Sequence, residues 1–508
     1  MSTDPKDLPA APVLLRRTQK LGALLDVAKA MAAQKDLLSL IRLVVEEAVR
    51  VAEADRGTVW LLDRDRQELR TYVAQGLGGG AKELRIPMTA GIAGFVATSG
   101  RSLKVPDAYS DPRFDRTSDQ RTGYKTRNIL AVPMWSVDHT VFGVLQVLNK
   151  REDVDGGRFT EDDQELLTAF GAQAAASLQS AMLYEEIQHL FEGFIKASVI
   201  AIEARDPTTS GHSERVAVLT TGLAETLEKA TTGRWKGTTF TPDEMREIRY
   251  AALLHDFGKI GVREEVLVKA NKLYPHELEK VKIRFDYIRR SLEVESLERR
   301  YALVKPAGEA AVRDLIDQEM AKLEKATKEL DELEEFVNAC NKPTVLEQGG
   351  FERLQEIQKR TYAGRAGTAP FLTPEEVVSL SIPRGSLSQR ERREIESHVT
   401  HTFKFLSQIP WSRALARIPE IAYGHHEKLD GKGYPRALPA ETISVQTRMM
   451  TISDIYDALT ASDRPYKKAV PHDKALGILE DEGKKGMIDQ DLLQIFVEAK
   501  VPTRLTRS

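Results

Sequence analysis

The sequence predicts two domains, an α+β domain followed by an all-α domain. A chain of 508 residues is longer than one ordinary hydrophobic core supports. Between residues 57 and 148 the apolar residues follow the two-residue period of β-strands, whereas from residue 160 onward they recur at helical spacing. This change of period separates the two predicted domains.

The composition excludes several classes of protein. Acidic and basic residues nearly cancel, 76 against 73, and no block of Lys or Arg offers a surface for duplex nucleic acid. Cys340 is the only cysteine, which is typical of a reducing compartment. No apolar run approaches the ~18 residues of a membrane span, and the N-terminus lacks the features of a signal peptide. We therefore expect a cytoplasmic protein with no membrane span and no duplex nucleic-acid partner.

The α+β region has the order of a sheet with accompanying helices. Residues 1–20 are rich in Pro and Ala without periodicity and are expected to be a disordered tail. Apolar spacing over 24–52 predicts two helices that are separated at Lys35 and Asp36. An antiparallel sheet with helices on one face is the simplest architecture for this combination of helices and strands. The predicted strands are 57–62, 69–73, 128–132 and 141–148.

Three segments of this region resemble a GAF domain, a fold that senses small molecules. The resemblance covers residues 21–183 and implies an unidentified small-molecule ligand. The segments are Gly91-Ile-Ala-Gly-Phe-Val-Ala97, Val105-Pro-Asp-Ala-Tyr-Ser-Asp-Pro-Arg-Phe114, and Gly143-Val-Leu-Gln-Val-Leu-Asn-Lys150 followed by Phe159-Thr-Glu-Asp-Asp163.

The same region approaches the pattern of the GAF domains that bind cyclic nucleotides. Four residues of that pattern are present, namely Asn149, Lys150, Phe159 and Asp163. Gln164 replaces its final Glu. The alternative, which we favour, is that Asn149 and Lys150 close a strand and Phe159 belongs to the core.

A long helix is expected to connect the two domains over residues 160–205. Its apolar stripe continues from Leu166 to Ile202 with no Pro- or Gly-rich linker after Gly171. A continuous helix transmits twist better than a flexible linker, and such a stripe can pair with its copy in a parallel dimer. We therefore expect a homodimer. The alternative is that the stripe packs wholly within its own domains.

Histidines beside acidic residues gather in the second half of the chain. The segment Leu253-Leu-His-Asp-Phe-Gly-Lys-Ile260 places His255 and Asp256 at the end of an apolar helix, where Gly258 is expected to let the chain turn. A single histidine of this kind is more often an ordinary polar residue than a ligand. Imidazole and carboxylate together suit divalent transition metals, and a carboxylate can bridge two ions. The sequence therefore predicts a binuclear metal site.

These motifs resemble, in order, those of the HD-GYP phosphodiesterases, which are named after His255-Asp256 and Gly433-Tyr-Pro435. The resemblance implies an all-α domain over 190–500 that binds two divalent metals, iron or manganese in most members, with zinc as an alternative. Asp256 is the implied bridge. Thr208 stands where some members place a third-metal Glu, and His401 has no counterpart. The implied ligands are His212, His255, Asp256, His398, His425, His426 and Asp454.

The resemblance also implies residues that act on the substrate. Asp256 and Lys259 are the implied catalytic residues, because the family lysine stabilises or protonates the leaving oxygen. The alternative for the charged contacts is surface salt bridging, and for Tyr434 it is anchoring of its loop rather than stacking on a guanine. The segment between Asp454 and Arg464, with Thr460-Ala-Ser-Asp-Arg464 at its end, looks one residue longer than in many members. This difference affects how far Arg464 can reach. The implied substrate contacts are Asp206, Arg464, Lys467, Gly433, Tyr434 and Pro435.

Residues 271–384 are interpreted as an insertion. In the family a Lys-Leu-x-Pro-Glu helix leads directly to the third histidine, but here Lys272-Leu-Tyr-Pro-His reaches Arg284 instead of a histidine. A second occurrence of the pattern begins at Gly385 and ends at His398. Helical spacing between them predicts a charged antiparallel hairpin. This hairpin could dock a protein partner, as could the Gly433-Tyr-Pro loop, or it could cover the site, extend a dimer contact or be solvated decoration.

The function implied by these resemblances is GAF-regulated, metal-dependent hydrolysis of cyclic di-GMP to linear pGpG and onward to GMP. One alternative substrate is the mixed GMP-AMP cyclic dinucleotide, because none of the implied site residues reads a base edge. Another alternative is a cyclic-nucleotide receptor or scaffold without turnover. The complete set of implied ligands argues against a receptor.

Overall fold

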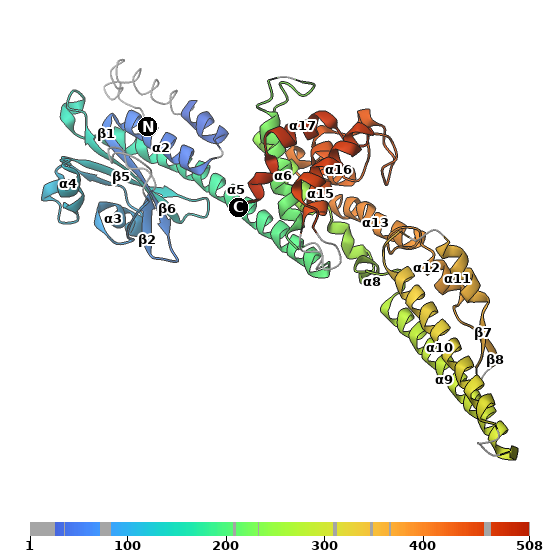
Figure 1. Cartoon of the computed structure of the whole chain (residues 1–508). Helices are drawn as coiled ribbons and strands as arrows, with labels where there is room; N and C mark the ends of the chain where they lie inside the picture. The colour runs from blue at the N-terminus through green and yellow to red at the C-terminus, as the bar shows by residue number, and fades with distance from the viewer. Residues whose placement is uncertain are drawn as a thin grey trace, which may run out of the picture. The chain divides into compact units, whose positions relative to one another are not determined.

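The chain forms two compact units, Met1–Glu192 and Gly193–Ser508 (Figure 1). A computed structural model describes residues 26–34, 36–71, 83–206, 210–231, 233–307, 312–345, 349–364, 367–461 and 469–506. The tail expected at 1–20 lies outside the described residues. Within the described residues, no helix has both the length and the apolar character to cross a membrane.

The first unit is built on a six-stranded antiparallel sheet in the order β3-β2-β1-β6-β5-β4. The predicted antiparallel sheet is therefore confirmed. Two of its strands were not predicted, because β3 and β4 have only four and three residues and show no clear alternation. The strands are β1 Ala54–Asp63, β2 Glu68–Thr71, β3 Leu84–Pro87, β4 Leu103–Val105, β5 Ile129–Trp135 and β6 Val141–Lys150.

Helices cover both faces of this sheet. Along β5, Leu130 and Val132 pack with helices α2 and α5, whereas Ile129 and Ala131 pack with α3. The expectation of helices on one face only was therefore wrong. Helix α3 consists almost entirely of apolar and small residues, so its sequence does not show the one-sided pattern of a surface helix. Within the described residues, 26–33 and 37–52 are helical, as predicted for residues 24–52. The labelled helices are α2 Leu37–Ala52, α3 Gly91–Ser99, α4 Thr117–Thr122 and α5 Glu161–Arg205.

Helix α5 is continuous over 45 residues. Its first part belongs to the core of the first unit, where Leu167, Phe170 and Leu178 are buried. Beyond that core the apolar stripe becomes exposed. Its exposed members are Leu183 (52%), Ile187 (63%), Leu190 (75%) and Phe194 (52%).

The second unit is a helical domain whose core is formed mainly by α6, α15, α16 and α17. The sequence explains where α7 begins, because Thr241 and Glu244 form a capping box and Pro242 is the first residue of the helix. The elements outside the insertion are α6 His212–Leu227, α7 Pro242–Leu254, η5 Phe257–Gly261, α8 Glu264–Leu267, α13 Gln389–Leu406, η7 Arg413–Leu415, α14 Ile418–Tyr423, η8 Ala440–Thr442, α15 Val445–Thr460, α16 His472–Lys484, α17 Gln490–Glu498 and η9 Val501–Thr506.

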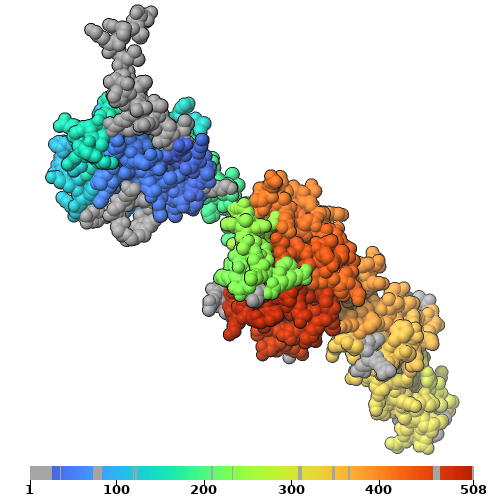
Figure 2. All heavy atoms as spheres, turned by 90° about the horizontal axis from the view of Figure 1, so that it is seen from above, coloured from blue at the N-terminus to red at the C-terminus, as the bar shows by residue number. Residues whose placement is uncertain are grey.

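The segment interpreted as an insertion is more than a hairpin. Helices α9 (Pro275–Ala307) and α10 (Arg313–Asn341) lie side by side and run in opposite directions (Figure 1). Two contacts show the antiparallel order: Arg289 pairs with Asp331, and Arg299, further along α9, pairs with the earlier Glu319. They share a separate apolar core with the elements that come after them. The space-filling view shows the surface of this segment in yellow to orange (Figure 2). The additional elements are α11 Gly350–Lys359, β7 Thr361–Gly364, β8 Gly367–Pro370 and α12 Pro374–Leu380.

Candidate metal centre

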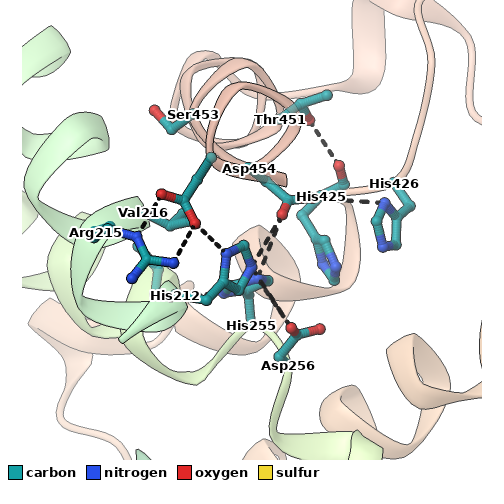
Figure 3. Close-up of polar contacts among 12 residues, drawn as sticks. His212, Arg215, Val216, His255, Asp256, His425, His426, Thr451, Ser453 and Asp454 are labelled. Atoms are coloured by element: carbon teal, nitrogen blue, oxygen red, sulfur yellow. Dashed lines mark hydrogen bonds and ion pairs between the residues drawn. The ribbon is translucent and has the colours of Figure 1, made fainter. Parts of the chain in front are cut away.

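Segments that are far apart in the sequence meet in one cluster of histidines and carboxylates (Figure 3). All of the metal ligands implied by the sequence lie in it. Three overlapping groups have ligand atoms within 4.8 Å of one another: His212, His255 and Asp256; His255, His425 and Asp454; and His398, His425 and His426. All of these side chains are buried except that of His426, which is 28% exposed.

Three of the histidines are oriented in the same way by their own helical turns. The Nδ1 atoms of His255, His398 and His425 lie 2.7, 2.6 and 2.6 Å from the carbonyl oxygen three residues earlier. The ring therefore donates its Nδ1 proton and keeps the lone pair on Nε2. These three Nε2 atoms are buried and have no hydrogen-bond partner among the described residues. Such an arrangement prepares each Nε2 to bind a cation.

The electrostatics keep most of these imidazoles neutral. Burial lowers the pKa of His255 and of His425, and it lowers the pKa of His426 to about 4. Burial would also lower the pKa of His212, but hydrogen bonds to Asp454 and Asp457 raise it to about 9. A cation at Nε2 of His212 would therefore have to displace a proton.

His212 is oriented by a residue that sequence reasoning missed. Its Nδ1 lies 2.7 Å from Oδ2 of Asp457, a buried residue that also accepts hydrogen bonds from Arg215 at 2.7 and 3.1 Å. Its Nε2 lies 3.2 Å from Oδ1 of Asp454. Asp457 is three residues after Asp454 on α15, so both carboxylates face the same side. This spacing was the signal available in the sequence.

Asp256 stands between the histidine groups and beside a buried lysine. Its Oδ2 lies 3.7 Å from Nε2 of His212 and 3.6 Å from that of His255, and its Oδ1 lies 3.3 Å from Nε2 of His398. Burial would raise the pKa of Asp256, but Lys259 and His255 hold it well below its usual range. The carboxylate is therefore ionised and faces both groups.

Lys259 links Asp256 to Asp206. Its Nζ lies 2.9 Å from a carboxylate oxygen of each. Burial would lower the pKa of Lys259, but Asp256 and Asp206 raise it to about 12. Asp206, which was implied as a substrate contact, is only 4% exposed and faces this lysine.

Gly258 has a different role from the turn that was expected. Its φ is not positive, and a Cβ at this position would come 1.9 Å from the carbonyl oxygen of His398 and 2.4 Å from the amide nitrogen of Thr402. The amide of Gly258 donates to Oγ1 of Thr402, which itself donates to the carbonyl of His255. The missing side chain thus lets η5 contact α13 and brings His255 and His398 into the same cluster.

The Gly433-Tyr-Pro loop is folded back on the histidines. The ring of Tyr434 lies 4.7 Å from that of His426, and its amide donates to the His426 carbonyl at 3.2 Å. Buried Glu427 accepts hydrogen bonds from the amides of Arg436 and Leu438. These contacts favour the alternative in which Tyr434 anchors its loop. Pro435 is exposed.

Other residues singled out in the sequence lie outside this cluster. His401 packs against Gly261 and belongs to none of the groups found among the described residues. Arg464, Lys467 and Thr208 lie outside the described residues.

In the first unit, the residues of the cyclic-nucleotide pattern have structural roles. Lys150 is fully buried, and its Nζ contacts Asp163, the carbonyl of Ala52 and Glu53 at 2.9, 3.1 and 3.2 Å. Asn149 donates to the Lys125 carbonyl, and Phe159 is in the core. These contacts tie the end of β6 to the start of α5. Asn149 and Lys150 close that strand and Phe159 is in the core, as the favoured interpretation expected.

Comparison with known families assigns both units. A GAF domain profile matches residues 36–178, and HD domain profiles match residues 209–341 and 363–492. The chain carries a GAF domain followed by an HD-family region. Both HD matches fall within the second unit, and the histidine cluster takes side chains from each. The first HD match ends inside the segment 271–384, so the boundaries of the insertion stay a prediction.

Two curated relatives are phosphodiesterases by name. A probable 3′,5′-cyclic phosphodiesterase, pde-5, of Caenorhabditis elegans is 32% identical over 178 residues, which are 32% of this chain and 24% of that protein. A 3′3′-cGAMP-specific phosphodiesterase 3 of Vibrio cholerae is 45% identical over 97 residues, which are 19% of this chain and 20% of that protein. The chain thus spans about a quarter or less of these relatives.

A solved structure is similar to part of this chain. The GAF domain of a phosphoenolpyruvate-protein phosphotransferase from Coxiella burnetii is 19% identical, with a TM-score of 0.30, and the match covers 33% of this chain and 96% of that one.

Proposed function

We propose that this chain is an HD-GYP-type phosphodiesterase that uses two divalent metal ions to hydrolyse a cyclic dinucleotide. The observation that carries this proposal is the set of three buried, unpartnered Nε2 atoms, on His255, His398 and His425, which face ionised carboxylates. Buried polar atoms without partners are rare in folded proteins, and a bound ion would satisfy three of them gathered beside carboxylates. HD-family membership and the two phosphodiesterase relatives agree with a hydrolase.

The donors fit two ions of a borderline transition metal. Imidazole nitrogen with carboxylate oxygen suits iron, manganese or zinc. We infer that His212, His255 and Asp454 would hold one ion, because Oδ1 of Asp454 lies 3.2 and 3.9 Å from Nε2 of His212 and of His255. His398, His425 and His426 would hold the other. Asp256 would serve both, since its two oxygens face different histidine groups.

The chemistry of the proposed reaction divides between the ions and Lys259. When bound, two divalent cations would lower the pKa of an attacking water and neutralise phosphate oxygens. With its pKa near 12, Lys259 holds its proton at neutral pH. It would therefore stabilise charge on the leaving oxygen rather than donate a proton. Asp206 would keep this ammonium group in place.

Cyclic di-GMP is the proposed substrate, with pGpG as the first product and GMP as a further one. Arg464 and Lys467 are proposed to contact its phosphates, and Tyr434 to hold the loop beside the site. The mixed GMP-AMP cyclic dinucleotide is a second candidate, because the relative from Vibrio cholerae that shares 45% identity is named for that specificity.

The test is metal analysis of anaerobically purified protein together with turnover of both dinucleotides. The expected result is two equivalents of iron or manganese per chain and release of a linear dinucleotide. Asp256→Ala is expected to lose metal and turnover while keeping its helical circular dichroism. Intact dinucleotides after incubation with a metal-loaded chain would refute the phosphodiesterase. Faster turnover of the mixed dinucleotide would instead select the second candidate.

We also propose that the chain forms a homodimer through α5. Leu183, Ile187, Leu190 and Phe194 recur at heptad spacing and are each at least half exposed. Sedimentation analysis tests this directly. Leu190→Asp is expected to shift the mass toward one chain, whereas His189→Asp on the neighbouring face is not. A single-chain mass for the wild type would refute the dimer.

A further inference from the structure

The start of helix α6, where His212 lies, is held by the last turn of α5. Oε2 of Glu203 accepts a hydrogen bond from the amide of Gly211 at 2.9 Å. Gly211 is the N-cap of α6 with φ 68°, and His212 is the first residue of the helix. The first amides of a helix need acceptors from outside it, and a carboxylate there is also favoured by the helix dipole. Glu203 therefore fixes where α6 begins.

A second contact leads from the same turn to Asp256. Asp206 comes directly after the last residue of α5, and its amide donates to the Ile202 carbonyl at 3.1 Å. Its carboxylate contacts Lys259, which contacts Asp256, at 2.9 Å in each case. Arg205, which lies between Glu203 and Asp206 in the sequence, donates a hydrogen bond to the carbonyl of Val262, just beyond η5, at 3.4 Å. We name Glu203, Arg205 and Asp206 the control turn.

His212 differs from the other histidines in what orients it. His255, His398 and His425 are each fixed by a carbonyl three residues earlier in their own turn. His212 is the first residue of its helix, and its ring is held by Asp457 of α15. Its backbone position depends on Glu203. Movement of α5 would thus displace His212 while leaving the other three rings fixed.

The other end of α5 lies in the GAF core. Leu167, Phe170 and Leu178 are buried there, and the helix continues without a break to Arg205. A continuous helix carries rotation or translation along its axis because each residue is hydrogen-bonded to the next turn. A change of α5 that starts among these residues would therefore reach the control turn.

We propose that the GAF domain controls the metal affinity of the site through the control turn. Glu203 positions His212, and Asp206 positions Lys259 and Asp256. This proposal rests on the proposed metal site, but it does not require that the site hydrolyse a dinucleotide. When α5 moves, Glu203 leaves the Gly211 amide and Asp206 leaves Lys259. The affinity for metal then falls.

The first experiment measures Mn²⁺ affinity of the full-length, metal-free chain by titration with electron paramagnetic resonance. Glu203→Ala is expected to weaken Mn²⁺ binding roughly tenfold, which is the usual effect of removing a residue that positions a metal ligand. Glu203→Gln keeps an acceptor oxygen and is expected to restore affinity to within about twofold. Glu214→Ala is the matched control, because it removes the same charge from the exposed side of the first turn of α6.

Two results of this titration would overturn the positioning role of Glu203. One is wild-type Mn²⁺ affinity in Glu203→Ala. The other is equal loss in Glu203→Ala and Glu203→Gln with unchanged circular dichroism. A chain that binds Mn²⁺ but hydrolyses neither dinucleotide would refute the proposed function alone, so the two failures are distinguishable.

The second experiment tests whether α5 transmits its state to the control turn. Insertion of two residues after Gln188 rotates the helix by roughly 200°, whereas insertion of seven rotates it by only about 20°. The two-residue insertion is expected to weaken Mn²⁺ binding, and the seven-residue insertion is expected to leave it near the wild-type value. In a background that carries both Glu203→Ala and Asp206→Ala, the two-residue insertion should add little, because both contacts of the control turn are already absent. Additive losses, or no effect of either insertion, would overturn the proposal.

Discussion

Nδ1 of His212 on α6 lies 2.7 Å from Oδ2 of Asp457 on α15. The same carboxylate accepts two hydrogen bonds from Arg215, one turn further along α6. Burial would raise the pKa of Asp457, but His212 and Arg215 lower it. An ionised Asp457 therefore holds the His212 ring with Nε2 toward Asp454.

Replacement of Asp457 by Ala is expected to weaken metal affinity by about 10–100-fold, because the His212 ring loses its orienting partner. Asp457→Asn is expected to fall between this variant and the wild type, since its amide oxygen can still accept a hydrogen bond. Isothermal titration with Mn²⁺ measures both. Asp473→Asn, an exposed carboxylate at the start of α16, is the control. Unchanged affinity in Asp457→Ala would contradict the orienting role.

Gly258→Ala is expected to destabilise the HD-family region by about 1–3 kcal/mol, because the added Cβ would collide with the backbone of α13. Metal affinity should fall as well, since Asp256 directly precedes η5 and His398 lies on α13. Urea unfolding followed by circular dichroism measures the loss. Gly477→Ala is the matched control, because it lies in α16 with nothing within 4 Å of its Cβ position, and it is expected to be neutral or stabilising by up to ~1 kcal/mol. Equal effects of the two substitutions would contradict the close approach of η5 and α13.

Lys150→Met is expected to destabilise the GAF domain by about 3–5 kcal/mol, because it leaves the buried carboxylate of Asp163 without its lysine. Lys104→Ala removes the pair with Glu161, whose side chain is 76% exposed, and should cost at most ~1 kcal/mol. Thermal unfolding of the full chain compares them. If Lys150→Met instead left stability unchanged and abolished binding of a cyclic nucleotide, the structural role would be wrong.

Glu391 should make stability depend on pH. Burial would raise its pKa, but hydrogen bonds from Lys269, Tyr274 and Ser388 lower it from 4.5 to about 2. Because the folded pKa lies below the unfolded one, this contribution of about 1–3 kcal/mol is present above pH ~4.5 and is lost as the pH falls toward 2. The difference in unfolding free energy between the wild type and Glu391→Gln should therefore shrink from pH 7 to pH 3. A constant difference would show that the carboxylate charge contributes nothing.

The sequence by itself determined the sheet-plus-helices domain, the helical domain and the membership of the histidine cluster. The strand 141–148 shows a two-residue period because Leu145 and Val147 on one face are fully buried, whereas Gln146 and Leu148 on the other are only partly buried. The candidate ligands were named from their resemblance to ordered family motifs, in which imidazole and carboxylate recur at fixed positions. All of these residues proved to lie together.

Only the tertiary structure revealed α3 on the second sheet face, the added elements of the segment 271–384, and the partners that orient the cluster. Asp457 and Glu203 act on His212 through contacts between elements, and nothing in the spacing along one helix specifies which segments will meet. Gly258 shows the same limit. A glycine is recognisable in the sequence, but whether it serves a turn or a close approach depends on the backbone that faces it, here that of His398 and Thr402.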